Sequence, residues 1–236
     1  MTKTVLFWDI DGTLLTTARA GIFAWEEALE HETGTYHDLS QFDTPGKTDI
    51  EIARDLSRLW GDGTELQKDR LVIRYEIALP GALPRKNGYV LDGALAALQH
   101  FRATEGVESF LLTGNTRRGA LAKLGYYGLL DLVSEGAFGD DALDRPGVAE
   151  VAMDVAERHL GFRPAPGRTF VIGDTPKDVA CGNWIGVRTV GVASGSYSAK
   201  ELSLAGAWIV LDKLPTPESL ARDLGIETPE ASNEPS

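Results

Sequence analysis

The sequence predicts an α/β protein with a mainly parallel sheet and an inserted helical block. Short apolar runs that suit buried strands alternate with helical stretches along most of the chain. Residues 17–88 break this alternation with helical patterns alone, and Pro80, Gly81 and Pro84 mark the return to it. Strand–helix alternation produces right-handed crossovers between parallel strands, so the carboxyl ends of the strands meet at one edge of the sheet.

Five apolar runs are the expected strands of this sheet. Their lengths and flanking residues favour buried strands over helices. They cover residues 5–8, 109–112, 169–172, 187–190 and 208–210. The helices expected between them cover residues 91–101, 147–160 and 175–184, which completes the βαβ pattern.

Residues 17–88 are expected to form a second, smaller domain. They hold helical stretches at residues 19–33, 48–59 and 65–79, and no convincing strand lies between these stretches. The α/β core domain is therefore expected at residues 1–16 and 89–226. Residues 227–236 are rich in Pro, Glu and Ser and are expected to be a disordered tail.

Composition and charge limit the classes of function. The chain has 236 residues, of which 43% are hydrophobic and 25% charged, so it is long enough for a large buried core. The net charge of −12 opposes binding to nucleic acid or to an anionic membrane. Cys181 is the one cysteine, which excludes an intrachain disulfide and a cysteine-based zinc site. The sequence shows no signal peptide and no long apolar run, so a cytoplasmic protein is expected, with its oligomeric state left open.

Two carboxylates follow the first expected strand. Asp9 and Asp11 stand two residues apart, and Gly12 permits a tight turn behind them. In an open α/β sheet, ligands bind at the carboxyl ends of the strands. One carboxylate could act as a nucleophile or metal ligand and the other as an acid and base. The alternative is a solvated Asp-Gly turn, which the pair by itself does not exclude.

A second pair of carboxylates, Asp174 and Asp178, follows the strand expected at residues 169–172. Asp178 also fits a helix start, with Thr175 as the N-cap and Pro176 at the first helical position. Asp174 lies before that cap, so capping does not explain it. For Asp178, capping the helix and supporting a metal are compatible roles.

Three polar residues follow a third expected strand. Thr113, Gly114 and Asn115 offer a hydroxyl and backbone N–H groups that can hold a phosphate oxygen. The alternative is that Asn115 or Thr116 caps the next helix. Arg145 lies just ahead of another helix, where a lone Arg is usually a surface residue.

Taken together, these motifs resemble those of the haloacid dehalogenase superfamily. The first motif is matched by Asp9-x-Asp11-Gly12-Thr13, the second by Thr113, the third by Arg145 and the fourth by Gly173-Asp174-x-x-x-Asp178. The long step between the first two motifs leaves room for the helical cap that many members carry there. The resemblance covers nearly the whole chain and implies a Rossmann-like parallel-sheet core with an inserted all-helical cap domain.

The resemblance also implies a magnesium-dependent phosphatase that acts on a small phosphorylated substrate. Asp9 would be the nucleophile that forms an aspartyl-phosphate, and Asp11 would protonate the leaving oxygen and then activate water. The implied Mg²⁺ site consists of Asp9, the backbone carbonyl of Asp11 and Asp174, with Asp178 behind them. The groups that would hold the phosphoryl oxygens are Gly12, Thr113, Gly114, Asn115 and Arg145.

Alternatives to this reading remain. The third motif of the superfamily is most often Lys, so Lys123 and Arg118 stay open beside Arg145. Asp11 favours phosphoryl transfer over dehalogenation and phosphonate cleavage, because members with those activities lack that aspartate. A phosphomutase of the β-phosphoglucomutase type would use the same motifs, and a non-catalytic binding protein on the same fold is a third candidate.

Lys47 is the expected substrate contact in the inserted block. It lies in a loop before a helix, in the sequence Thr-Pro-Gly-Lys-Thr-Asp. This loop is similar to the Gly-(Lys/Arg)-Thr-Asp loop of phosphoglycolate phosphatase and of β-phosphoglucomutase-type members. Lys47 is therefore expected to meet an anionic group of the substrate, the alternative being an exposed lysine beside a capped helix.

Overall fold

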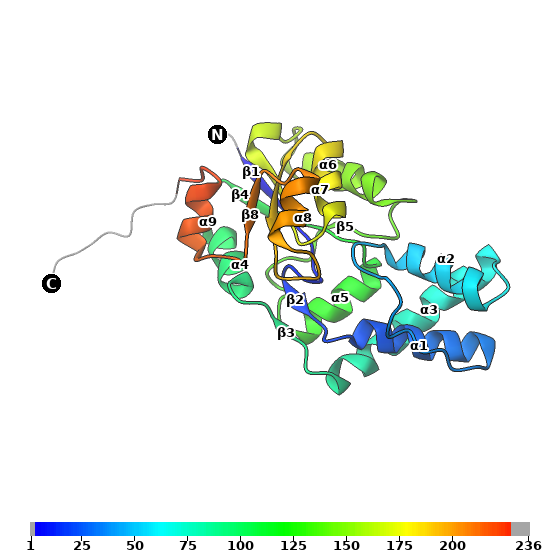
Figure 1. The fold of residues 1–236 in the computed structure, drawn as a ribbon. Coiled ribbons are helices and arrows are strands. Elements are labelled where there is room, and N and C mark those ends of the chain that lie inside the picture. The colour runs from blue at the N-terminus through cyan, green and yellow to red at the C-terminus, as the bar shows by residue number, and fades with distance from the viewer. Residues whose placement is uncertain (1–2, 228–236) are drawn as a thin grey trace.

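The computed structural model describes residues 3–227 and confirms the α/β fold. Six parallel strands form one sheet in the order β5-β4-β1-β6-β7-β8 (Figure 1). The strands are β1 (Thr4–Trp8), β4 (Val107–Leu112), β5 (Gly136–Ala137), β6 (Thr169–Gly173), β7 (Arg188–Val192) and β8 (Ile209–Leu211). The pattern of the sequence predicts all of these except β5, because a strand of two residues carries no periodicity.

Helices cover both faces of the sheet, which explains why the central strands β1 and β6 are fully buried and mainly apolar. The helices are α4 (Ala94–Ala103), α5 (Arg117–Tyr126), α6 (Arg145–Leu160), α7 (Pro176–Trp184), α8 (Ala199–Ala205) and α9 (Pro217–Asp223), with a short 3₁₀ helix η2 (Pro166–Arg168) before β6. In β1, Leu6 and Trp8 pack with α4, α5 and α9, whereas Val5 and Phe7 pack with α6 on the other face. Successive side chains of a strand point to opposite faces, so all of β1 is buried.

The inserted segment is helical, as predicted. It contains α1 (Ala20–Thr33), α2 (Asp49–Trp60), α3 (Glu65–Ala82) and the 3₁₀ helix η1 (Leu83–Arg85). These helices share a buried core of their own, in which Trp25 stacks on Tyr75 with ring centres 4.0 Å apart. Figure 1 shows α1, α2 and α3 beside one another, away from the sheet.

The end of α3 corrects one sequence expectation. The helix passes through Pro80 to Ala82, where the sequence predicts an end at Leu79. Pro80 has no backbone N–H to donate, but it lies in the last turn, so the helix loses a single backbone hydrogen bond. Leu79, Ala82 and Leu83 are all buried in the helical core, and this packing keeps the last turn formed.

A short ribbon connects the two parts of the chain. β2 (Leu15–Thr16) and β3 (Tyr89–Val90) pair antiparallel, so the chain enters and leaves the helical segment at one place. Ala18 and Arg19 follow β2 with φ angles of 46° and 72°, a left-handed conformation that costs energy for residues other than glycine.

Apart from Glu227, the tail predicted at residues 227–236 lies outside the described residues. Within residues 3–227, the helices lack the length and apolarity needed to cross a lipid bilayer.

Candidate active site

The predicted motifs meet at one edge of the sheet because their strands are neighbours in register. β1 lies between β4 and β6, with Trp8 opposite both Leu111 and Ile172. The residues that follow these strands therefore come together, and the backbone N–H of Asp9 donates to the carbonyl of Ile172 at 3.0 Å. They border a cavity of about 680 Å³ that is also lined by residues of the helical segment, among them Trp25 and Lys47.

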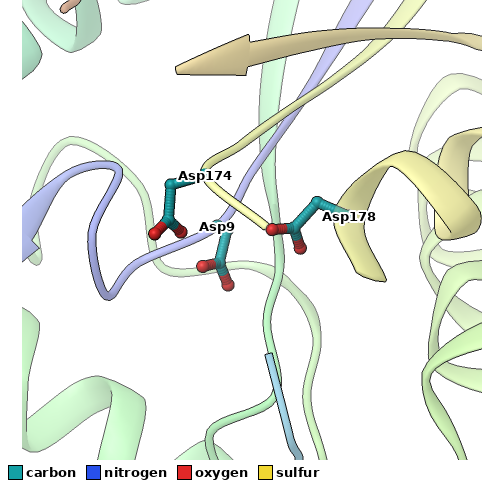
Figure 2. Close-up of side chains that lie close together, drawn as sticks. All are labelled: Asp9, Asp174 and Asp178. Carbon is teal, nitrogen blue, oxygen red and sulfur yellow. The ribbon is translucent and has the colours of Figure 1, made fainter. Parts of the chain in front are cut away.

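Three aspartates form an acidic cluster at this edge of the sheet (Figure 2), and two of them, Asp9 and Asp174, line the cavity. One carboxylate oxygen from each of Asp9, Asp174 and Asp178 lies within 4.8 Å of the others, and all three residues are buried. Burial, reinforced by the charge of Asp178, raises the pKa of Asp9 to about 8 and the pKa of Asp174 to about 9. Within the described residues, Asp174 Oδ1 is buried without a hydrogen-bond partner. A cation bound here would offset the repulsion between the carboxylates and satisfy that oxygen.

Arg145 is the cation that the structure brings to the cluster. It is the first residue of α6 and is buried, it pairs with Asp178, and its Nη1 lies 3.8 Å from Asp9 Oδ1. Arg145 is therefore not the surface residue that a lone Arg usually is. Of the alternatives for this cation, Arg118 is exposed and Lys123 contacts a different carboxylate.

Asp178 caps a helix, which is one of the two roles that the sequence left open. Its Oδ2 accepts the N–H of Thr175 at 3.0 Å, and the Thr175 hydroxyl accepts the N–H of Asp178 in return at 3.3 Å, which completes a capping box at the start of α7. Its Oδ1 accepts from Arg145. Asp178 thus fixes the helix start and the guanidinium, while the same carboxylate belongs to the acidic cluster.

Asp11 lies beside the cluster and is held by two donors. Its Oδ2 accepts from Asn115 Nδ2 at 2.7 Å and from Lys123 Nζ at 2.6 Å. Asn115 Nδ2 also donates to the hydroxyl of Thr113 at 2.9 Å. The helix α5 is capped by Thr116, whose hydroxyl accepts the N–H of Gly119 at 3.1 Å. Asn115 is therefore turned toward Asp11 rather than capping the helix.

Two glycines allow loops to approach Asp174 closely. At Gly12, with φ of 85°, a Cβ would lie 2.3 Å from Asp174 Oδ2, and at Gly195 it would lie 1.6 Å away. The hydroxyl of Ser194 donates to the carbonyl of Gly12 at 2.6 Å, which joins these two loops. Sequence reasoning missed Ser194 and Gly195, although their place after the strand expected at residues 187–190 is a signal that could have found them.

Lys47 lines the cavity from the helical side, but its charge is already paired. Its Nζ lies 3.1 Å from Asp55 and 3.8 Å from Asp43, and 5.2 Å from the centre of the Phe42 ring. The side chain keeps 21% of its surface exposed. Lys47 therefore lines the cavity with only part of its hydrogen-bonding capacity free, and its contact with the substrate stays a prediction.

Asp49 is a further residue to which the sequence analysis gave no role. Its backbone N–H donates to the carbonyl of Gly114, and its Oδ2 accepts the N–H of Thr116, both at 2.8 Å. The start of α2 is thereby fixed to the loop that follows β4. Burial raises the pKa of Asp49 to about 7, against the opposing effect of the positive charge on Lys123.

The fold and this site define a hydrolase of a known class. A family model described as haloacid dehalogenase-like hydrolase matches residues 3–186. This match spans most of the chain, so the protein belongs to the haloacid dehalogenase-like hydrolases. A search of curated proteins finds no match.

Solved structures share this fold over nearly their whole length. A hydrolase from Pseudomonas syringae aligns with a TM-score of 0.73 at 22% identity, over 94% of this chain and 99% of its own. A predicted phosphatase from Clostridium acetobutylicum aligns with a TM-score of 0.71 at 18% identity, over 95% and 99%. CbbY from Rhodobacter sphaeroides, solved in complex with phosphate, aligns with a TM-score of 0.71 at 16% identity, over 90% and 95%.

Proposed function

We propose that this hydrolase is a magnesium-dependent phosphatase of small phosphomonoesters that forms an aspartyl-phosphate on Asp9. The observation that carries the proposal is the pairing of a buried acidic cluster with a buried arginine at the strand ends. Asp9 belongs to that cluster, and its Oδ1 lies 3.8 Å from Nη1 of Arg145, which also pairs with Asp178. A site of this kind attracts an anionic phosphate into an acidic protein only if cations balance its carboxylates.

The reaction proceeds in two steps. A carboxylate oxygen of Asp9 bonds to phosphorus while the bond from phosphorus to the ester oxygen breaks, and Asp11 gives a proton to the leaving oxygen. Asp11 then removes a proton from water, which attacks phosphorus and releases phosphate and free Asp9. The phosphoryl oxygens are held by the Thr113 hydroxyl, the loop N–H groups beside it and Arg145.

Magnesium fits the residues of the cluster. Hard oxygen donors, few protein carboxylates and a substrate phosphate are what Mg²⁺ prefers, and Asp174 Oδ1 is a buried oxygen in need of a partner. Asp9, the carbonyl of Asp11 and Asp174 would hold the ion, and Asp178 would hold Arg145 beside them. The bound ion supplies positive charge that reduces the repulsion between Asp9 and the incoming phosphate.

Residues 17–88 are proposed as a cap domain on a core of residues 1–16 and 89–226. The β2–β3 ribbon at the limits of this segment, and the helical core that it encloses, support the division. Opening and closing about the ribbon would admit substrate and exclude water during reaction. Lys47 would meet the end of the substrate remote from phosphorus.

A phosphate-release screen tests the proposal and separates it from its rivals. Purified protein is assayed on a panel of phosphomonoesters, with Mg²⁺ or with EDTA, and beside the Asp9→Asn variant. Free phosphate released only with Mg²⁺ and only by the unmodified protein is the expected result. An isomerised sugar phosphate without net phosphate release would favour a phosphomutase, and no product of either kind would favour a binding protein.

A further inference from the structure

We propose that Lys123 is a positioning residue that holds the carboxylate of Asp11 for proton transfer, an inference that rests on the acid and base role proposed for Asp11. Lys123 projects from α5 and donates to Asp11 Oδ2 at 2.6 Å. It also donates to the amide oxygen of Asn115, whose Nδ2 donates to the same Asp11 oxygen at 2.7 Å. The three side chains form a closed set of hydrogen bonds, and Asp11 Oδ2 accepts two of them.

The two partners of this ion pair differ in exposure. The Asp11 side chain has 41% of its surface exposed, whereas Lys123 has 5%. A short side chain that faces a cavity can populate several rotamers, and fixing one of them costs conformational entropy. Lys123 is anchored in the protein, and within residues 3–227 its ion pair is with Asp11. The buried lysine therefore restrains the exposed aspartate, and not the reverse.

The donors also determine which oxygen of Asp11 can exchange a proton. Oδ2 faces an ammonium and an amide N–H, so a proton placed there would displace one of these donors. Within the described part of the chain, neither donor bonds to Oδ1. Oδ1 is thus the oxygen that can give a proton to the leaving group and later take one from water. Fixing Oδ2 directs Oδ1, and a displacement of about 1 Å in such a group can cost about 100-fold in rate.

The arrangement assigns one cation to each carboxylate of the first motif. Arg145 lies against Asp9 and Asp178, and Lys123 lies against Asp11. Lys123 therefore does not replace Arg145 as the cation of the acidic cluster. Its role belongs to the proton-transfer half of the site.

The first test compares Lys123→Met with a matched control, Lys200→Met, on the exposed surface of α8. Values of kcat and KM are measured with an alkyl phosphomonoester and with p-nitrophenyl phosphate. For the alkyl ester, Lys123→Met should lower kcat by about 100-fold and change KM by less than about threefold. With p-nitrophenyl phosphate, the burst of p-nitrophenolate should slow far less, because this leaving group needs little protonation. Lys200→Met should behave as the unmodified protein.

A double-mutant cycle then asks whether Lys123 acts through Asp11. In an Asp11→Asn background, Lys123→Met should lower turnover of p-nitrophenyl phosphate by less than about threefold, because no carboxylate is left to position. Independent losses that multiply, or a rise in KM with kcat unchanged, would overturn the proposal. If Lys123→Met does not fold, as judged by circular dichroism, Lys123→Ala is assayed with and without propylammonium. Recovery of kcat by the amine is expected, and its absence would equally overturn the proposal.

Failure of the proposed function would look different from failure of this inference. In that case the unmodified protein would release no phosphate from either ester, or Asp9→Asn would retain activity. If both of those controls behave as expected, the effect of Lys123→Met tests only whether Lys123 positions Asp11.

Discussion

The sheet edge and the helical segment both contribute charged residues to the cavity, but they hold them in different ways. At the sheet edge, Asp9, Asp174 and Arg145 are buried, and strand register or a helix start fixes each of them. In the helical segment, Lys47 keeps 21% of its side chain exposed and already pairs with Asp55. Rigid, desolvated charges suit bond making and breaking, whereas adaptable charges suit the choice of substrate.

The largest difference between the two regions should appear at the nucleophile. Asp9→Asn should preserve the fold and lower turnover by at least about 1000-fold, because an amide oxygen is a very poor nucleophile. Phosphate release is measured, and circular dichroism checks the fold. Release above a few per cent of the unmodified rate would remove Asp9 from the nucleophile role and weaken the distinction drawn between the regions.

Metal removal should have the next largest effect, again at the sheet edge. Asp174→Asn or treatment with EDTA should lower kcat/KM by about 100-fold or more, and Ca²⁺ should replace Mg²⁺ poorly because it takes more ligands at longer distances. Full activity in EDTA, after removal of bound metal, would contradict the metal site.

The acidic cluster should also make the stability of the protein depend on pH and on Mg²⁺. The pKa of Asp9 is raised to about 8 and that of Asp174 to about 9, so in the metal-free protein the folded state favours the protonated carboxyls. Their contribution to stability is complete below the unfolded value of 3.8 and is lost as pH rises through these raised values. Mg²⁺ should therefore raise Tm more at about pH 8 than at about pH 5, since protons compete with the ion. An equal shift at both pH values would argue against binding at this cluster.

How far the sequence predicts this architecture depends on whether a feature is local. The strand at residues 5–8 is predicted correctly because it is buried on both faces. The helical stretch predicted at residues 48–59 is found as α2, and a capping box of Thr48 and Glu51 fixes its start. The two-residue strands of the ribbon leave no such pattern. In the site, the convergence of Asp9 and Asp174 follows from parallel strand ends. No local rule, however, relates Lys123 to Asp11, 112 positions away in the chain.

A moderate effect is expected where the helical segment meets the substrate. Lys47→Ala should raise KM by about tenfold for a substrate with a second anionic group and change kcat/KM for p-nitrophenyl phosphate by less than about twofold. The expected loss of substrate binding lies at the low end of the range for a charge-assisted hydrogen bond, because the ammonium of Lys47 also donates to Asp55. Lys68→Ala is the matched control, since Lys68 pairs with Glu65 on α3. Equal, small changes with both substrates would leave Lys47 without a role in selection.

The smallest effect is expected at Asp49, where the two regions touch. Its pKa is raised from 3.8 to about 7 by burial, so the stability associated with its protonated form is lost as pH rises through 7. Asp49→Asn keeps an oxygen that can accept the N–H of Thr116 and removes the buried charge. At about pH 8 the variant should melt about 2–4 °C higher than the unmodified protein, with the difference shrinking toward about pH 4. A lower melting temperature at both pH values would show that the charge itself stabilises the contact.

The most direct test of the account is to trap the phosphorylated enzyme. The protein is mixed with a phosphomonoester and Mg²⁺, quenched in acid during turnover, digested and examined by mass spectrometry. The account predicts one phosphoryl group on the peptide that contains Asp9, removable by hydroxylamine as expected for an acyl phosphate and absent from Asp9→Asn. Turnover with no phosphorylated peptide, or with the phosphoryl group on another residue, would contradict it.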